Sequence, residues 1–150
     1  MKRFNVFIIA LCLSLPIFFG ADANAQQKKV TVLTSKDFAE KVYDLSKDNP
    51  EYLGSRPAII DFYASWCGPC RAISPILDGL AAEYGDRIVI YKVDVDASPE
   101  IAREFGIRSI PAVLFIPLGG EPVMTVGGRG KDEFKRQIDT ILLGKEDSGK

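Results

Sequence analysis

The sequence predicts an α/β domain in which a central mixed sheet is covered by helices on both faces. Short apolar runs alternate with helical patterns between residues 30 and 143. The run from Ala58 to Ala64 is apolar except for Asp61, which is typical of a strand buried on both faces. Two further runs, 112–116 and 123–126, flank a Gly119-Gly120 turn and predict an antiparallel hairpin. We expect about five strands and about four helices.

Residues 1–25 have the three parts of a secretory signal peptide. Lys2 and Arg3 make the start basic, an apolar stretch runs from Val6 to Phe19, and Ala23-Asn24-Ala25 provides the small residues that signal peptidase accepts. We therefore expect export and cleavage before Gln26. The expected location is periplasmic or otherwise extracytoplasmic.

Two other interpretations of this segment remain open. A retained membrane anchor needs an apolar stretch of roughly 20 residues, and the stretch from Val6 to Phe19 is shorter. A lipoprotein would carry its lipid on Cys12, but Leu11 stands where a small residue is required. Cleavage accounts for the segment better than either alternative.

The remaining residues, 26–150, have the size of a single domain. Its core spans about residues 30–143, and a charged tail, 144–150, is expected to fray. The formal net charge of the whole chain is −1, and removal of Lys2, Arg3 and Asp22 changes it by only one unit. This balance gives no reason to expect a nucleic-acid surface. We expect a monomer with no stable membrane insertion after cleavage.

The first part of the domain predicts a strand, a helix and a loop. Val30–Leu33 forms a short strand, and Thr34 or Ser35 caps the helix that follows. The apolar face of this helix consists of Phe38, Val42 and Leu45. Lys47 to Arg56 contains Asn49-Pro50 and Gly54, and this composition predicts a loop.

Three further helices follow the central strand, and another strand lies between the first two of them, in addition to the hairpin. A helix from Cys67 to Tyr84 should be kinked by Pro75, and Ile88–Val95 forms the next strand. Ser98 caps a short helix that Phe105-Gly106 ends, with Pro99 at its first position. Lys131–Leu143 is the closing amphipathic helix. On the helix from Cys67 to Tyr84, the residues expected to face inward are Ile73, Ile76, Leu77, Leu80 and Ala81. On the closing helix they are Phe134, Ile138, Ile141 and Leu142.

Cysteine usage points to redox chemistry. Loss of Cys12 with the signal peptide leaves only Cys67 and Cys70, separated by two residues. A bridge between them closes a very small loop and stabilises a fold little, so the pair is expected to react. Zinc needs four Cys or His ligands, and this sequence has no histidine and no second cysteine pair. We expect neither a metal nor a cofactor beyond the redox-active disulfide itself.

The position of the pair at a strand-to-helix junction suits this chemistry. Free N–H groups and the helix dipole stabilise an anion at the helix start, so Cys67 is the expected nucleophile. Cys70, one turn later on the same face, would resolve the mixed disulfide. Asp61 is a charge in an apolar strand and therefore a candidate general base. In the alternative interpretation, Asp61 lies at the end of the strand and its carboxylate is in contact with water.

The segment from Asp61 to Cys70, DFYASWCGPC, resembles the active-site segment of the thioredoxin family. Pro75, Lys92, Ile110-Pro111 and Gly127 also fall where thioredoxins carry matching residues. The resemblance covers about Val30 to Leu143 and implies a thioredoxin fold and thiol–disulfide exchange. The sequence departs from it at Tyr63, where many thioredoxins have tryptophan, and in a longer connection over residues 47–56.

The resemblance also implies roles for individual residues. Asp61 would shuttle the proton of Cys70, and Lys92 would either pair with Asp61 or point to solvent. Trp66, with Gly68 and Pro69 of the spacer, would contact the substrate beside the disulfide.

Three more residues would complete the substrate groove. The bond between Ile110 and Pro111 would be cis and would present the backbone of Ile110 to an extended substrate. Gly127 would form the bare floor of the same groove.

The direction of the reaction depends on the spacer, Gly68-Pro69. Oxidants and isomerases of the superfamily commonly place a histidine before the second cysteine, and its absence here favours reduction of protein disulfides. Partners would be exported proteins with disulfides and an unidentified membrane electron donor. Open alternatives are a disulfide oxidase or isomerase, a thiol reductant in cytochrome c maturation, and a chaperone or binding module that uses the groove around Trp66 and Pro111 without turnover.

Overall fold

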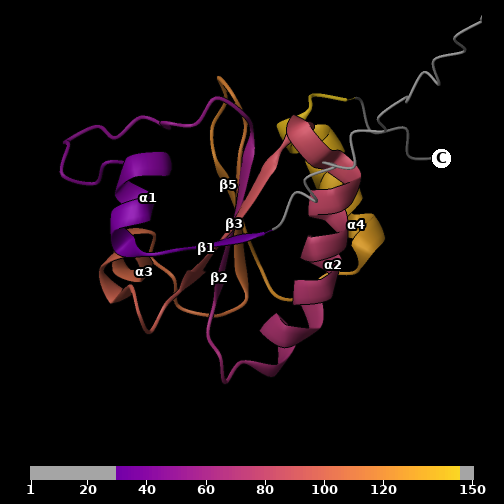
Figure 1. Cartoon of the computed structure of the whole chain (residues 1–150), viewed down its shortest axis with the longest axis horizontal. Helices are drawn as coiled ribbons and strands as arrows, with labels where there is room; N and C mark the ends of the chain where they lie inside the picture. Colours follow the sequence, from indigo (N-terminus) through magenta and orange to yellow (C-terminus); the bar gives the residue numbers. More distant parts are fainter. Residues whose placement is uncertain (1–29, 146–150) are drawn as a thin grey trace, which may run out of the picture.

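A five-stranded mixed sheet in the order β1-β3-β2-β4-β5 forms the centre of the computed structural model, which describes residues 30–145 (Figure 1). β1, β3 and β2 are parallel, and β4 is antiparallel to both β2 and β5. The signal peptide, its cleavage site and residues 146–150 lie outside the described residues. The strands are β1 (Thr31–Leu33), β2 (Ala58–Tyr63), β3 (Val89–Asp94), β4 (Ala112–Ile116) and β5 (Val123–Val126).

Helices cover both faces of this sheet (Figure 1). α1 and α3 lie on one side, and α2 and α4 lie on the other. The helices are α1 (Ser35–Lys41), α2 (Gly68–Tyr84), α3 (Pro99–Glu104) and α4 (Lys131–Gln137), with short helical segments η1 (Gly85–Arg87) and η2 (Ile138–Leu142). The predicted α/β architecture, with five strands and four α-helices, is confirmed.

The central strand β2 supplies both halves of the core. Ile59 packs in the cluster beneath α2 and α4, whereas Ile60 and Phe62 pack in the cluster beneath α1 and α3. Successive side chains of a strand point to opposite faces. Asp61, two residues after Ile59, therefore lies on the α2 side of the sheet.

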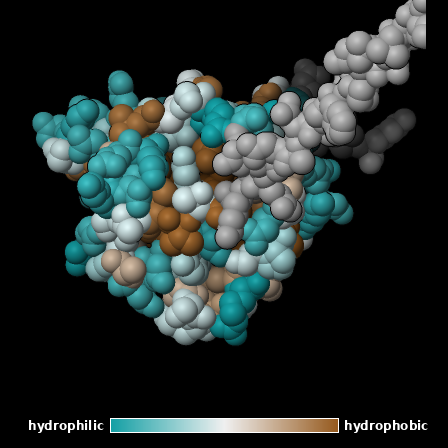
Figure 2. All heavy atoms as spheres, viewed as in Figure 1, coloured by the Kyte–Doolittle hydropathy of each residue, from teal (hydrophilic) through white to brown (hydrophobic). Residues whose placement is uncertain are grey.

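The surface seen in Figure 2 is hydrophilic at its margins and has hydrophobic side chains in its middle, over the region of β1 in Figure 1. β1 is an edge strand, and its Val32 is exposed. Within residues 30–145 the structure contains no helix with the length and hydropathy needed to cross a membrane.

The first helix is shorter than expected. Thr34 caps it with a capping box, as predicted, but α1 ends at Lys41 and does not extend to Leu45. The chain turns away because Tyr43 forms a bridge with Tyr52, and the N–H of Leu53 donates to the carbonyl of Val42. The loop over residues 47–56 thus returns to pair with the end of α1, which buries Val42 and Tyr43 without further helix.

Two other local predictions hold only in part. Ser98 is the N-cap residue of α3 and Pro99 is in its first turn, as predicted, but the Ser98 side chain makes no capping hydrogen bond. It is buried and accepts a hydrogen bond from the Ser35 hydroxyl instead. The closing helix is α-helical only to Gln137 and continues as a π-helical segment, η2, in which the Leu143 N–H donates to the Ile138 carbonyl.

Candidate active site

The two cysteines lie at the start of α2, immediately beyond the end of β2. Cys67 is the N-cap residue and Cys70 is in the first turn, with Cα atoms 5.3 Å apart. Their sulfurs form a disulfide of 2.09 Å. The exposed fractions are 4% for Cys67 and 1% for Cys70, so Cys67 is slightly more accessible. The pair is therefore placed as the sequence predicts.

The helix start favours a thiolate on Cys67. The backbone N–H of Cys70 donates to the Sγ of Cys67 at 3.2 Å, so the sulfur occupies the position of a helix-capping acceptor. The first turn of α2 contains no acidic residue that would repel an anion. The free N–H groups and the dipole of a long helix lower the pKa of a thiol at this position.

Asp61 is fully buried in the middle of β2. It stands in register with Lys92 of β3 and Val113 of β4. Neither carboxylate oxygen has a hydrogen-bond partner among the described residues. Burial raises the pKa of Asp61 from 3.8 to about 6, and the charge of Lys92 opposes this rise. The alternative of a carboxylate in water is excluded by this burial.

Lys92 also turns inward, so the alternative of a solvent-facing lysine is wrong. Its side chain is 14% exposed, and its Nζ lies 3.5 Å from Oδ2 of Asp61. The same Nζ donates a hydrogen bond to the hydroxyl of Ser74 on α2. It also lies 4.4 Å from the centre of the Tyr63 ring, a cation–π contact. The tyrosine that departs from the family pattern thus holds the active-site lysine.

The loop opposite the cysteines contains the predicted cis bond, between Ile110 and Pro111. Ile110 packs against the small apolar cluster that contains Cys67 and Cys70. The N–H of Gly127 donates to the carbonyl of Pro111 at 2.8 Å, which fixes the loop after β5 beside it. The cis peptide is thus placed next to the redox pair.

Gly127 has a φ of 95°, which side chains rarely adopt, and a Cβ placed on it would meet nothing within 4 Å. Open space therefore lies beside this backbone, and the role of Gly127 as the floor of a substrate groove stays a prediction. Gly68 and Pro69, the two residues between the cysteines, are exposed at the start of α2.

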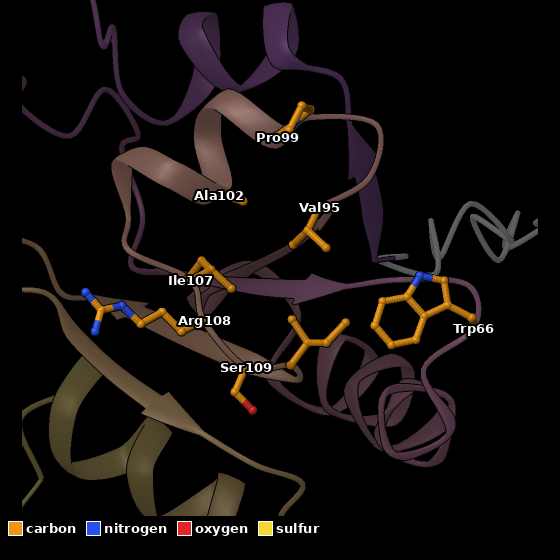
Figure 3. Close-up of a pocket in the computed structure, with 8 residues that line it drawn as sticks. Trp66, Val95, Pro99, Ala102, Ile107, Arg108 and Ser109 are labelled. Carbon is orange, nitrogen blue, oxygen red and sulfur yellow. The ribbon is translucent and has the colours of Figure 1, made fainter.

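A groove of about 250 Å³ adjoins Trp66 (Figure 3). Trp66 is 67% exposed, and its Nε1 donates to Oδ2 of Asp96 at 2.8 Å. The indole is therefore held in place although most of it faces solvent. The groove is lined by Trp66, Val95, Pro99, Ala102, Ile107, Arg108, Ser109 and Ile110.

Sequence reasoning missed Ser74 and Asp96. Ser74 lies four residues after Cys70, so a polar residue on the same face of the helix is the only signal that could have marked it. Asp96 carries no such signal, because it is 30 residues from Trp66 and only the fold brings the two together. No cluster of three His, Cys, Asp or Glu side chains suited to a metal occurs in the described part of the chain.

Comparisons with known proteins agree with this geometry. The thioredoxin family model matches residues 29–140, which is most of the chain. The chain belongs to the thioredoxin family. A thioredoxin from Borreliella burgdorferi is 46% identical over 107 residues, covering 71% of this chain and 92% of that relative. A thioredoxin from Mycolicibacterium smegmatis is 38% identical over 111 residues, covering 72% of this chain and 99% of the relative.

A solved structure also matches the thioredoxin fold of this chain. The crystal structure of chloroplastic thioredoxin z superposes with a TM-score of 0.64 at 26% identity, covering 75% of this chain and 94% of the other. The resemblance noted in the sequence is confirmed, and so is the thioredoxin fold. The protein is a thiol–disulfide oxidoreductase with a Cys67–Cys70 disulfide.

Proposed function

We propose that this family member acts as a protein-disulfide reductase. The observation that carries the proposal is the position of Cys67 as N-cap of α2, where its sulfur accepts the N–H of Cys70. In the reduced protein this position favours a thiolate on Cys67. The Cys67 thiolate attacks one sulfur of a substrate disulfide, forms a mixed disulfide with it and expels the other sulfur as a thiolate.

The second step completes the exchange. The Cys70 thiol gives its proton to the Asp61 carboxylate, and the Cys70 sulfur attacks the Sγ of Cys67. The Cys67–Cys70 disulfide forms, the substrate leaves as its second thiolate, and Asp61 returns its proton to solvent. The two substrate thiolates take up two protons from solvent, which balance the proton that Cys70 releases through Asp61 and the proton that Cys67 released when it ionised; the dithiol supplies the two electrons.

Asp61 suits the role of proton acceptor. Its pKa of about 6 leaves it ionised at neutral pH and brings it closer to the pKa of a thiol than an ordinary aspartate. It lies on the same side of the sheet as α2, which carries Cys70. The groove beside Trp66 and the backbone of Ile110 would then hold an extended segment of the substrate.

The simplest test is reduction of insulin with dithiothreitol as electron donor. The wild-type protein should accelerate insulin precipitation, and Cys67→Ser should abolish the acceleration. Cys70→Ser should also stop turnover, because it leaves the mixed disulfide unresolved. Full activity of Cys67→Ser would overturn the assignment.

The direction of the reaction is tested by the reduction potential. The spacer Gly68-Pro69 and the absence of histidine favour a potential near that of thioredoxin, about −270 mV, and not the roughly −120 mV of a strong oxidant. Equilibration with a dithiothreitol redox buffer measures it. A value near the oxidant's would replace the reductase proposal with that of an oxidase.

The site of action is proposed to be outside the cytoplasm. The signal-peptide pattern of residues 1–25 supports this, with exported disulfide proteins as substrates and a membrane protein as electron donor. Cell fractionation and mass spectrometry of the mature protein test it, with Gln26 as the expected first residue. An uncleaved N-terminus in the cytoplasmic fraction would contradict the proposal.

A further inference from the structure

Lys92 shares its charge among three partners that come from two elements. Its Nζ donates to the Ser74 hydroxyl of α2, lies over the Tyr63 ring of β2, and is 3.5 Å from Oδ2 of Asp61. The distance to the carboxylate is longer than the roughly 2.8 Å of a charge-assisted hydrogen bond. The ammonium is thus close to Asp61 but does not form the short contact that an unpaired buried carboxylate would attract.

The unusual feature is which oxygen accepts a short hydrogen bond from the Lys92 ammonium, which has three N–H donors. Asp61 is fully buried and both of its oxygens lack hydrogen-bond partners in the described part of the chain, yet the ammonium donates to a neutral hydroxyl. The backbone of Ser74 is fixed within α2, so its short side chain reaches only a limited volume. The hydroxyl therefore limits how closely Nζ approaches the carboxylate.

We propose that Ser74 is a positioning residue that holds the Lys92 ammonium on the α2 side and so keeps it from forming a short hydrogen bond with the Asp61 carboxylate. Other charged or titratable groups around the pair are few. Tyr63 faces it from β2, and Asp94 of β3 acts on the Tyr63 hydroxyl. From β4, the residue in register with Asp61 is the apolar Val113.

This arrangement matters for the second step of the proposed function, on which the inference rests. Ser74 follows Cys70 by four residues on α2, so the residue proposed to position Lys92 lies on the same face of the helix as the cysteine whose proton Asp61 is proposed to take. A direct Lys92 hydrogen bond would stabilise the ionised carboxylate and weaken it as a base. The hydroxyl of Ser74 preserves its basicity.

The expected effect follows from the distances. If Ser74→Ala lets Nζ move from 3.5 Å to about 2.8 Å from Oδ2, an effective dielectric constant of about 20 lowers the Asp61 titration midpoint by about one pH unit. Ser74→Thr keeps the hydroxyl and should leave the midpoint at its wild-type value. Lys92→Gln should raise it, because the opposing charge is lost.

The experiment is an NMR titration of the Asp61 side-chain carboxyl carbon in the reduced full-length variants. The double variant Ser74→Ala, Lys92→Gln should titrate like Lys92→Gln alone, since Ser74 acts through the lysine. The proposal would be overturned if the Asp61 midpoint in Ser74→Ala were the same as in the wild type or higher. It would also be overturned if Ser74→Ala shifted the midpoint in a chain that already carries Lys92→Gln.

The activity assay keeps the two proposals apart. If ionised Asp61 accepts the proton, insulin reduction should rise with pH through the carboxyl midpoint, and this rise should move to lower pH in Ser74→Ala along with the midpoint. If the midpoint moves and the activity profile does not, Ser74 positions Lys92 but Asp61 is not the proton acceptor, so the proposed role of Asp61 fails alone. If the midpoint does not move, the inference fails while the reductase assignment stands.

Discussion

Replacement of Asp61 by asparagine should remove a pH-dependent part of the protein's stability. Asp61 is fully buried, and burial raises its pKa to about 6. An acid whose pKa is higher in the folded chain stabilises the fold while it is protonated, below its unfolded value near 3.8. That contribution is lost as the pH rises through the folded value of about 6. The Asp61 variant should not show this loss, because an amide does not titrate.

The size of the effect follows from the shift itself. Each pKa unit corresponds to about 1.4 kcal/mol, so the rise from 3.8 to about 6 amounts to about 3 kcal/mol. Relative to Asp61→Asn, the wild type should therefore lose about 2.4 kcal/mol of unfolding free energy between pH 4 and pH 7, because part of the full effect is already lost at pH 4, just above the unfolded value of 3.8. Burial of the amide in Asp61→Asn has a cost that does not depend on pH. It shifts the stability difference between wild type and variant by a constant and leaves the pH dependence of that difference unchanged.

Urea unfolding at pH intervals between 4 and 8 measures this difference. Asp78→Asn on the exposed side of α2 is the matched control, because it removes the same charge without touching the core. The control should follow the pH dependence of the wild type. A stability difference between wild type and Asp61→Asn that stays constant across this range would refute the assignment of a raised pKa to Asp61.

Three other substitutions test separate parts of the site and fold. Asp96→Ala removes the acceptor of the Trp66 indole, so the emission of this single tryptophan should change and the KM for protein substrates should rise; unaltered emission would contradict the hydrogen bond. Gly127→Ala should cost about 1–2 kcal/mol in urea unfolding because φ is 95°, and wild-type stability would argue against that conformation. Thr34→Ala should cost about 1 kcal/mol by loss of the α1 cap; a change near zero in the unfolding midpoint would show that the cap contributes little.

The sequence predicted the parts of the fold that depend on local pattern. The apolar run around Asp61 marked the central strand, because only a strand buried on both faces has so few polar residues. The cysteine pair was found because its spacing at a helix start has chemical meaning by itself. The cis bond before Pro111 came from the family resemblance and is confirmed.

The errors arose where distant residues decide a local structure. Periodicity extended α1 toward Leu45, but pairing of Tyr43 with Tyr52 ends the helix earlier. Ser98 is the N-cap residue that its type predicts, yet its hydroxyl accepts a hydrogen bond from Ser35 and makes no capping bond. Helical periodicity and residue type do not carry this information, because the contacts are made by a returning loop at Tyr52 and by a residue 63 positions away at Ser35.

The site shows the same division. The alternating pattern of β3 did not decide whether the Lys92 side chain points toward Asp61 or toward solvent. In the structure Lys92 stands in register with Asp61, and its Nζ lies 3.5 Å from Oδ2 of that residue. The contact of Lys92 with Ser74 joins β3 to α2 across 18 residues, so it emerges only from the packed structure. Sequence reasoning thus found the groups that are proposed to react and missed Ser74, which is proposed to position Lys92.

The central claim is that Cys67 attacks and Cys70 resolves, and capture of a reaction intermediate tests it most directly. The Cys70→Ser variant, in a chain that begins at Gln26 so that Cys12 is absent, is reduced and mixed with a disulfide-linked peptide. Mass spectrometry should find one peptide joined to Cys67, whereas Cys67→Ser should capture little, because Cys70 is less exposed than Cys67 (1% against 4%) and does not occupy the N-cap position that favours a thiolate. Equal or greater capture by the Cys67→Ser variant would contradict the account.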